Sequence, residues 1–289
     1  MSITSFSLIA FTMMMQSAAG LVLVSELGQY KFAGKEEQPL ARCLPVALIL
    51  GVLGLGIAFY HLASPLAAFY VILNVGSSPL SREIMLVVSF IALMAIVFLI
   101  RRKNPESGAT ILGGVTAIVG LLMVWSIAEV YTRQTIPTFN TAGTDLSFFG
   151  TTLLVGSVLG AVLYGTSAGS LATQGSKLPE LFMVVAAVGL GLAYVGAPLS
   201  IVARTAVDNY GVSGLSPLVV SGQWPVVFVL GLLLTAAGLV FCMLAGLKAI
   251  KSNQAASITR FSVLALVLVV IGEVIGRYAF YESFLRAGI

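Results

Sequence analysis

The stretch LARCLPVALILGVLGLGIAFYHL, residues 40–62, decides the fold class, because Arg42 is its only fixed charge. An α-helix needs about 20 consecutive and mostly apolar residues to cross the hydrocarbon core of a bilayer. This stretch is long enough to span a membrane as a single helix. Its last residue but one is His61, the only histidine of the chain.

The rest of the chain has the same character. Of its 289 residues, 58% are hydrophobic and only 9% are charged, and the mean hydropathy is +1.05. A soluble protein of this size carries far more charge. The apolar runs are too long for strands and lack sustained alternation, so a β-barrel is not favoured. We therefore expect an all-α integral membrane protein, a single transmembrane domain over residues 1–289. Its eight predicted spans are 3–25, 40–62, 82–100, 109–131, 146–167, 178–197, 224–247 and 261–281.

The distribution of lysine and arginine predicts the orientation of these helices. The connections that follow the odd-numbered spans carry ten of the 15 basic residues. Cytoplasmic connections are enriched in Lys and Arg, so both termini are predicted on the outer, periplasmic side. The basic residues are scattered over these connections. We expect these residues, which give the protein its formal charge of +4, to fix the membrane topology and to contact anionic lipid. We expect no nucleic-acid partner.

Several kinds of redox chemistry are disfavoured by the residues that the chain lacks. Cys43 and Cys242 do not form a C-x-x-C motif, which argues against an iron–sulfur cluster or an attached c-type haem. A membrane cytochrome b with paired haems needs several axial histidines, and His61 is alone. We therefore expect no metal, haem or iron–sulfur cluster on this chain, and any larger chemistry to lie on another subunit.

Ionisable residues gather at the predicted outer helix ends. Glu129 and Arg133, and likewise Glu273 and Arg277, stand four residues apart, a spacing that favours ion pairs within a helix. We predict a structural role for both pairs. Tyrosines near the same helix ends are typical of an aromatic belt at the membrane surface.

His61 and Glu83 have no such partner nearby in the sequence. One interpretation is structural: Ser81 caps the third helix with Glu83 in its first turn, and His61 bonds a last carbonyl of the second helix. The other is functional. An imidazole that titrates near neutral pH and a carboxylate at the membrane edge are suited to taking protons from a hydroquinone. Arg82 or Arg277 would then hold the oxygen atoms in their anionic stages.

Three stretches of the sequence resemble the membrane-anchor subunits of the dimethyl sulfoxide reductase family. The first runs from His61-Leu-Ala-Ser-Pro65 to Ser78-Pro-Leu-Ser-Arg-Glu-Ile84, and is similar to the family's H-L-G-S-P … L-S-x-E-I. The second is Val130-Tyr131 followed by Pro137-Thr138. The third is Gly272-Glu273 followed by Gly276-Arg277. The sequence departs from the usual glycine, arginine and tryptophan of the family at Ala63, Ala67 and Phe139.

This resemblance implies a function and partners. The protein would anchor a molybdoenzyme-type anaerobic respiratory reductase to the bacterial inner membrane. Its partners on the outer side would be a four-cluster ferredoxin-like iron–sulfur subunit and a molybdopterin catalytic subunit. Menaquinol would be oxidised near the outer face. His61 and Glu83 would be its catalytic residues, and Arg82, Tyr131 and Arg277 would help to bind it. The terminal electron acceptor would be chosen by the catalytic subunit.

Two other functions remain open from the sequence. A small-solute transporter would carry charged residues at mid-membrane, broken helices and two related halves. A purely structural tether would dock the partner subunits without a quinol site.

Overall fold

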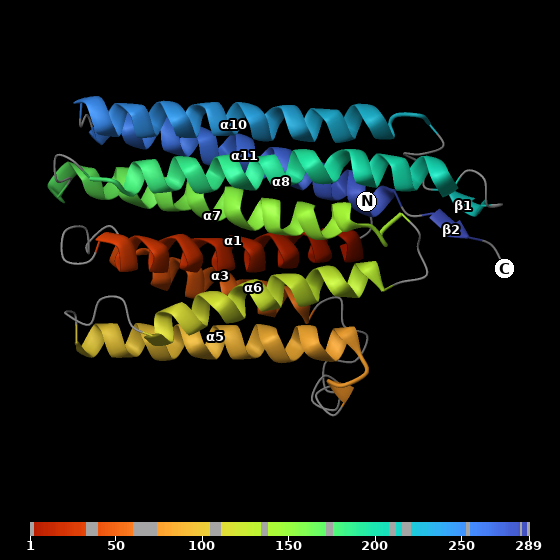
Figure 1. The fold of residues 1–289 in the computed structure, drawn as a ribbon, viewed down its shortest axis with the longest axis horizontal. Helices are drawn as coiled ribbons and strands as arrows, with labels where there is room; N and C mark the ends of the chain where they lie inside the picture. The colour runs from red at the N-terminus through yellow and green to blue at the C-terminus, as the bar shows by residue number, and fades with distance from the viewer. Residues whose placement is uncertain are drawn as a thin grey trace.

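The computed structural model is a bundle of helices that run along one common direction (Figure 1). It describes residues 3–32, 40–59, 74–104, 111–133, 138–171, 176–207, 212–215, 221–252, 255–283 and 285–287. His61, the predicted catalytic histidine, lies outside these described residues.

The helices follow the apolar runs of the sequence, because a helix satisfies its own backbone hydrogen bonds where lipid offers none. Seven helices of the described part are long and apolar enough to cross a membrane, so this is a multi-pass membrane protein. The apolar helix α3 has only 16 residues, so the predicted count of eight spans stays a prediction. The helices are α1 (Ile3–Phe32), α3 (Cys43–Ala58), α5 (Pro79–Lys103), α6 (Ile111–Thr132), α7 (Ala142–Leu171), α8 (Leu178–Val207), α10 (Trp224–Ser252) and α11 (Ala255–Glu282).

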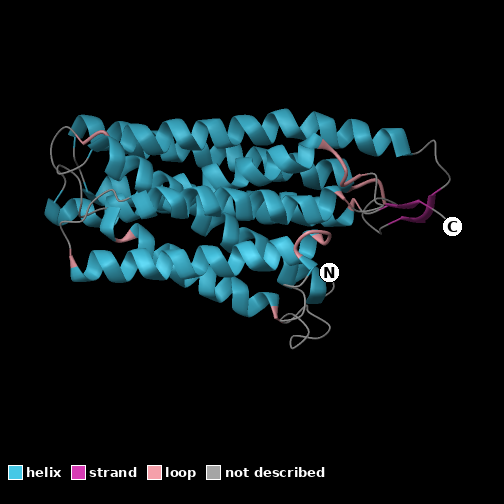
Figure 2. Ribbon diagram, turned by 60° about the horizontal axis from the view of Figure 1, so that its bottom comes forward, coloured by secondary structure: helices cyan, strands magenta, loops and turns pink. Residues whose placement is uncertain are grey.

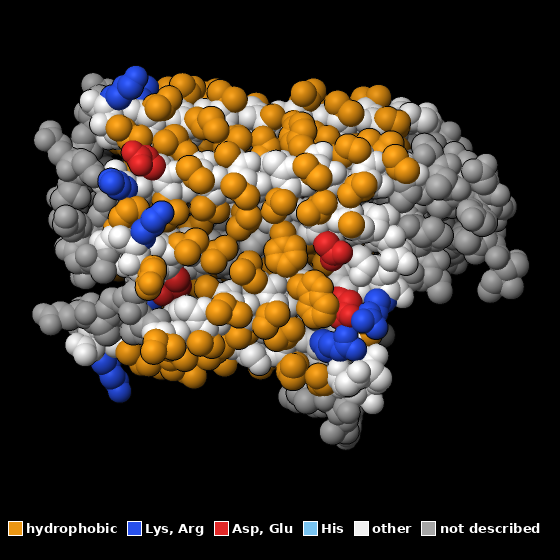
Figure 3. All heavy atoms as spheres, viewed as in Figure 1, with side chains coloured by type: hydrophobic (Ala, Val, Ile, Leu, Met, Phe, Trp, Pro, Cys, Tyr) orange, Lys and Arg blue, Asp and Glu red, His pale blue; other side chains and the backbone are white. Residues whose placement is uncertain are grey.

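Helix α1 begins and helix α11 ends at the same end of the bundle, which we call the terminal end (Figure 1). At the opposite end, which we call the basic end, α1, α5 and α10 have lysine or arginine in their last turns. Charged side chains lie near these two ends, and hydrophobic side chains cover the surface between them (Figure 3). This is the distribution expected of helices that contact lipid along their middle.

Two details differ from the all-helical prediction. Strands β1 (Val212–Leu215) and β2 (Leu285–Ala287) form a short antiparallel pair beyond the helices (Figure 2). Strands this short show no clear alternation in the sequence. Helix α8 continues through Pro198 to Val207, whereas the predicted span ended at residue 197. A proline inside a transmembrane helix is tolerated because neighbouring groups compensate for the lost backbone hydrogen bond.

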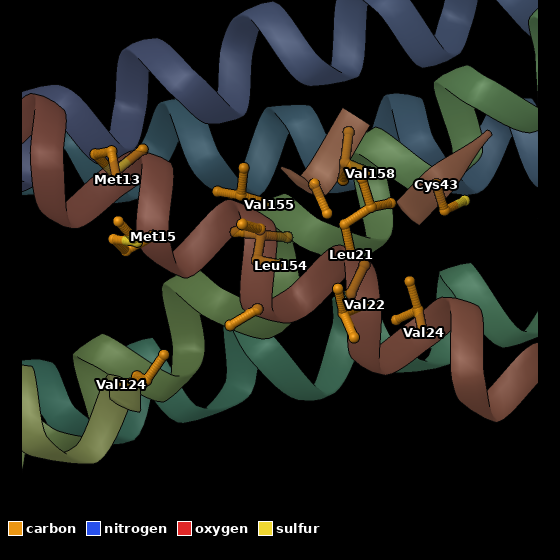
Figure 4. Close-up of a cluster of buried hydrophobic side chains, with 14 of the residues drawn as sticks. Met13, Met15, Leu21, Val22, Val24, Cys43, Val124, Leu154, Val155 and Val158 are labelled. Carbon is orange, nitrogen blue, oxygen red and sulfur yellow. The ribbon is translucent and has the colours of Figure 1, made fainter. Parts of the chain in front are cut away.

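Helix α1 lies at the centre of the bundle. In an apolar segment of 18 residues in α1, 78% is buried inside the bundle, compared with 28% in the corresponding segments of α5, α8 and α10. Met15 and Leu21 of α1, Val124 of α6 and Leu154 of α7 belong to one cluster of buried side chains (Figure 4). The position of α1 therefore determines how the surrounding helices meet.

A pair of glycines lets α1 and α7 approach closely. A Cβ atom added to Gly20 would overlap the carbonyl oxygen of Thr152, and one added to Gly156 would meet the Cα of Gly20 at 2.5 Å. Small residues allow such close contact between transmembrane helices. Gly272 of α11 likewise lies against Gly231 of α10.

We predict that Gly20→Leu forces α1 and α7 apart and destabilises the protein by about 1–3 kcal/mol, the usual cost of overpacking. The measurement is the thermal midpoint in detergent, followed by size-exclusion chromatography. Gly114→Leu on α6 is the matched control, because a Cβ there meets no atom within 4 Å. Equal midpoints for the two variants would contradict the prediction.

Candidate functional site

Glu83 lies deeper in its helix than the sequence suggested. Helix α5 begins at Pro79, and its N-cap is Ser78, whose hydroxyl accepts a 3.4 Å hydrogen bond from the backbone N–H of Ser81. Proline is favoured in the first turn of a helix, where its missing N–H costs nothing. The predicted cap at Ser81 and first-turn position of Glu83 are therefore wrong. Glu83 stands in the second turn with only 9% of its surface exposed.

The carboxyl group of Glu83 has no hydrogen bond or ion pair with any residue in the described ranges. It lies within electrostatic range of the hydroxyls of Tyr131 at the end of α6 and Tyr281 at the end of α11. These two hydroxyls are hydrogen-bonded to each other at 2.9 Å. A buried carboxyl group beside two hydroxyls is able to accept a hydrogen bond, or a proton, from a bound molecule.

Aromatic rings surround the tyrosine pair. Tyr131 lies edge-on to Phe139 and Phe280, with ring centroids 6.0 and 5.7 Å away, and Phe139 and Phe280 are stacked at 4.5 Å. Phe148 of α7 lies 5.6 Å from Tyr131. The rings pack with the tyrosine pair into one buried aromatic cluster.

Arg82 connects the start of α5 to α6. Its Nη1 donates to both carboxylate oxygens of Glu129, at 3.0 and 2.9 Å. Its Nε and Nη2 donate to the carbonyl oxygens of Val75 and Gly76, which precede the helix. The predicted ion pair of Glu129 with Arg133 is confirmed, at 2.7 Å. Within the described residues, Arg82 thus acts as a clamp that positions Glu83, the next residue.

Glu273 and Arg277 of α11 do not form the direct ion pair that their spacing predicted. Instead, the hydroxyl of Thr151 donates to Glu273 at 2.7 Å and accepts from Nη2 of Arg277 at 3.2 Å. The same Nη2 donates to Gln16 of α1 at 2.9 Å, and the guanidinium lies 3.7 Å from the ring centre of Phe148. Packing against α1 and α7 draws Arg277 away from Glu273.

The structure brings four predicted site residues to the terminal end: Arg82, Glu83, Tyr131 and Arg277. Sequence reasoning missed Tyr281, Gln16 and Thr151. Two signals existed. Tyr281 follows Arg277 by four residues, which puts both on one helix face. Gln16 is an amide in the middle of an apolar run, where polar side chains are costly unless they have a partner.

Comparison with known proteins identifies the family. Residues 1–282 match the family model described as DMSO reductase anchor subunit (DmsC). The sequence is 29% identical to YnfH, a subunit of an anaerobic dimethyl sulfoxide reductase of Escherichia coli K12, over 98% of this protein and 95% of the relative. It is 28% identical to the C subunit of anaerobic dimethyl sulfoxide reductase from the same organism, over 98% of this protein and 96% of the relative.

A shorter match, 33% identical, covers 54% of this protein and 57% of the C subunit of anaerobic dimethyl sulfoxide reductase from Haemophilus influenzae. The family model spans almost the whole sequence. The protein therefore belongs to the family of DMSO reductase anchor subunits.

Proposed function

We propose that this protein anchors an anaerobic respiratory reductase to the bacterial inner membrane and oxidises menaquinol at the terminal end of the bundle. The observation that carries the proposal is the buried carboxyl group of Glu83, which has no hydrogen-bond partner in the described residues and lies beside Tyr131 and Tyr281. Membership of the anchor family supports the role in a reductase complex.

Oxidation of a hydroquinone releases two protons and two electrons. Glu83 accepts the proton of one hydroxyl, and His61, the only imidazole of the sequence, accepts the other. The positive charge of Arg277 lies near the Tyr131–Tyr281 pair and favours the anionic stages. The electrons pass directly to a four-cluster ferredoxin-like iron–sulfur subunit, and from there to a molybdopterin catalytic subunit.

The orientation follows from the basic residues. In this proposal the basic end faces the cytoplasm, the terminal end faces the periplasm, and the protein crosses the membrane eight times. Between the two ends, residues 18–24 of the central helix α1 are all apolar, and most are fully buried. On the far side of this layer, Glu26 binds Arg101 through two hydrogen bonds of 2.8 and 2.7 Å. The apolar layer supports proton release at the terminal end alone.

We predict that Glu83→Gln and His61→Ala each lower menaquinol-dependent reduction by the assembled complex about tenfold or more, as loss of a proton acceptor does. Reduction by an artificial dye, which bypasses the anchor subunit, stays at the wild-type rate. Glu180→Gln, an exposed carboxylate at the start of α8, is the control. Unchanged menaquinol activity in both variants would favour the structural tether.

A second prediction concerns the clamp. Arg82→Gln removes the charged hydrogen bonds to Glu129 and frees the residues before α5, so it costs about 1–3 kcal/mol and lowers menaquinol-dependent turnover. Arg133→Gln has a smaller effect, because its side chain is 60% exposed. Thermal midpoints and turnover of the two variants test this order, and the reverse order would refute it.

A third prediction concerns charge movement. Protons and electrons that leave on one side carry no net charge across the membrane. The purified complex, reconstituted in sealed vesicles with the terminal end outward, should turn over without generating a membrane potential and without a net pH change in the outer medium, because reduction of an oxide acceptor by the outer partner consumes the two protons that the quinol releases. A pH dye outside the vesicles and a voltage-sensitive dye measure the two quantities. A potential that grows with turnover would rule out this topology of proton release.

A further inference from the structure

A cavity of about 60 Å³, lined in part by polar side chains, lies among α7, α8, α10 and α11 near the terminal end. Its walls include Glu273 and Arg277 together with the hydroxyl residues Thr144, Ser147 and Ser283. A cavity needs roughly 10–15 Å³ for each water molecule, so this one holds a few waters and is too small for a quinol ring. Glu83 does not line it, but Arg277 and Phe280 do, so the cavity adjoins the proposed quinol site.

Buried hydrogen-bond donors at this cavity have no acceptor in the part of the protein that the structure describes. Arg277, which lines the cavity, is only 3% exposed, and its Nε and Nη1 find no partner among the described residues. The same is true of Nε2 of Gln16, which does not line the cavity but whose Oε1 accepts a hydrogen bond from Arg277. Buried polar groups of native proteins are almost always hydrogen-bonded, to protein or to ordered water. A cavity at Arg277 with polar side chains in its walls is able to supply that water.

Electrostatic interactions and hydrogen bonds connect the quinol site to the cavity. Glu83 lies within electrostatic range of Tyr131 and Tyr281, whose hydroxyls are hydrogen-bonded to each other. Tyr281 lies one turn from Arg277 and interacts with its charge. Arg277 then bonds Thr151, which bonds Glu273 on the cavity wall. The contacts cross from α5 to the far half of the bundle.

We propose that this cavity holds ordered water and is the compartment through which the quinol site releases protons, with Glu273 as the receiving carboxylate. The inference rests on the proposed function. As the O–H bond of the hydroquinone breaks, its proton passes to Glu83, and its electrons pass to the partner iron–sulfur subunit. The proton then moves through the Tyr131 and Tyr281 hydroxyls and water to Glu273, and from there to water at the terminal end. Arg277 keeps its own protons and holds the water.

Such an outlet serves turnover, because Glu83 holds one proton at a time and has to lose it before the next quinol is oxidised. Glu273 acts through Glu83 and does not touch the quinol. Blocking the outlet should therefore slow turnover without weakening quinol binding.

Gly276 offers a way to fill the cavity. It lines the cavity, and a Cβ atom added to it meets no atom within 4 Å, so Gly276→Ala fits without a clash and the two further methyl groups of Gly276→Val are expected to displace water. Glu273→Gln removes the carboxylate that receives the proton but keeps the shape of the side chain. The matched control is Gly191→Val on α8, an exposed position where a Cβ also meets nothing within 4 Å.

The experiment measures menaquinol and dye turnover by the assembled complex, in ordinary and in heavy water. We expect kcat with menaquinol to fall about tenfold in Gly276→Val and Glu273→Gln, equivalent to about 1.4 kcal/mol in the barrier, with KM unchanged. The solvent isotope effect should rise, because proton release becomes limiting. Dye turnover, and the Gly191→Val variant, should match the wild type. If Gly276→Val does not assemble, the smaller Gly276→Ala and Glu273→Gln decide the result.

Wild-type kcat and isotope effect in both cavity variants would overturn the inference. A loss confined to Glu273→Gln would also overturn it, since that result assigns the carboxylate a structural role. A wild-type complex that does not oxidise menaquinol, or a Glu83→Gln variant that oxidises it normally, would instead refute the proposed function itself.

Discussion

The close crossing of α1 and α7 at Gly20 and Gly156 is the contact on which the rest of the arrangement depends. In lipid, helices gain little from burying apolar surface, so close packing of small residues has to hold them together. This crossing puts α1 in the middle of the bundle, where Gln16 reaches Arg277 on α11 and Glu26 reaches Arg101 on α5. One central helix thereby organises the polar contacts at both ends.

Charged groups inside a membrane protein are costly unless they have partners, and the terminal end shows how most of that cost is offset. Glu129 is held by two arginines, and Glu273 by a threonine that also contacts Arg277. In the described part of this end, Glu83 is the buried carboxylate that lacks such a partner. A buried carboxylate without a partner does not stabilise the fold, so a role in binding a ligand explains Glu83 better than a structural role does.

Local pattern predicted the helices and the ion pair of Glu129 with Arg133, since each depends on residues a few positions apart. The contacts of Arg277 were not predictable in this way, because its partners Gln16 and Thr151 come from two distant helices. The place of Tyr281 near a helix end favours a role in an aromatic belt, and only the meeting of α6 and α11 shows its hydrogen bond to Tyr131. His61 stays a prediction, because it lies outside the described residues.

The apolar layer of α1 at residues 18–24 has a consequence for energy conservation. Moving one elementary charge across a membrane costs about 2.3 kcal/mol for every 100 mV of potential. A quinol oxidation that moves no charge through this layer is free of that opposing force. The proposed reductase would therefore keep its rate at a high membrane potential. It would still oxidise menaquinol under conditions in which that potential slows the electrogenic respiratory enzymes.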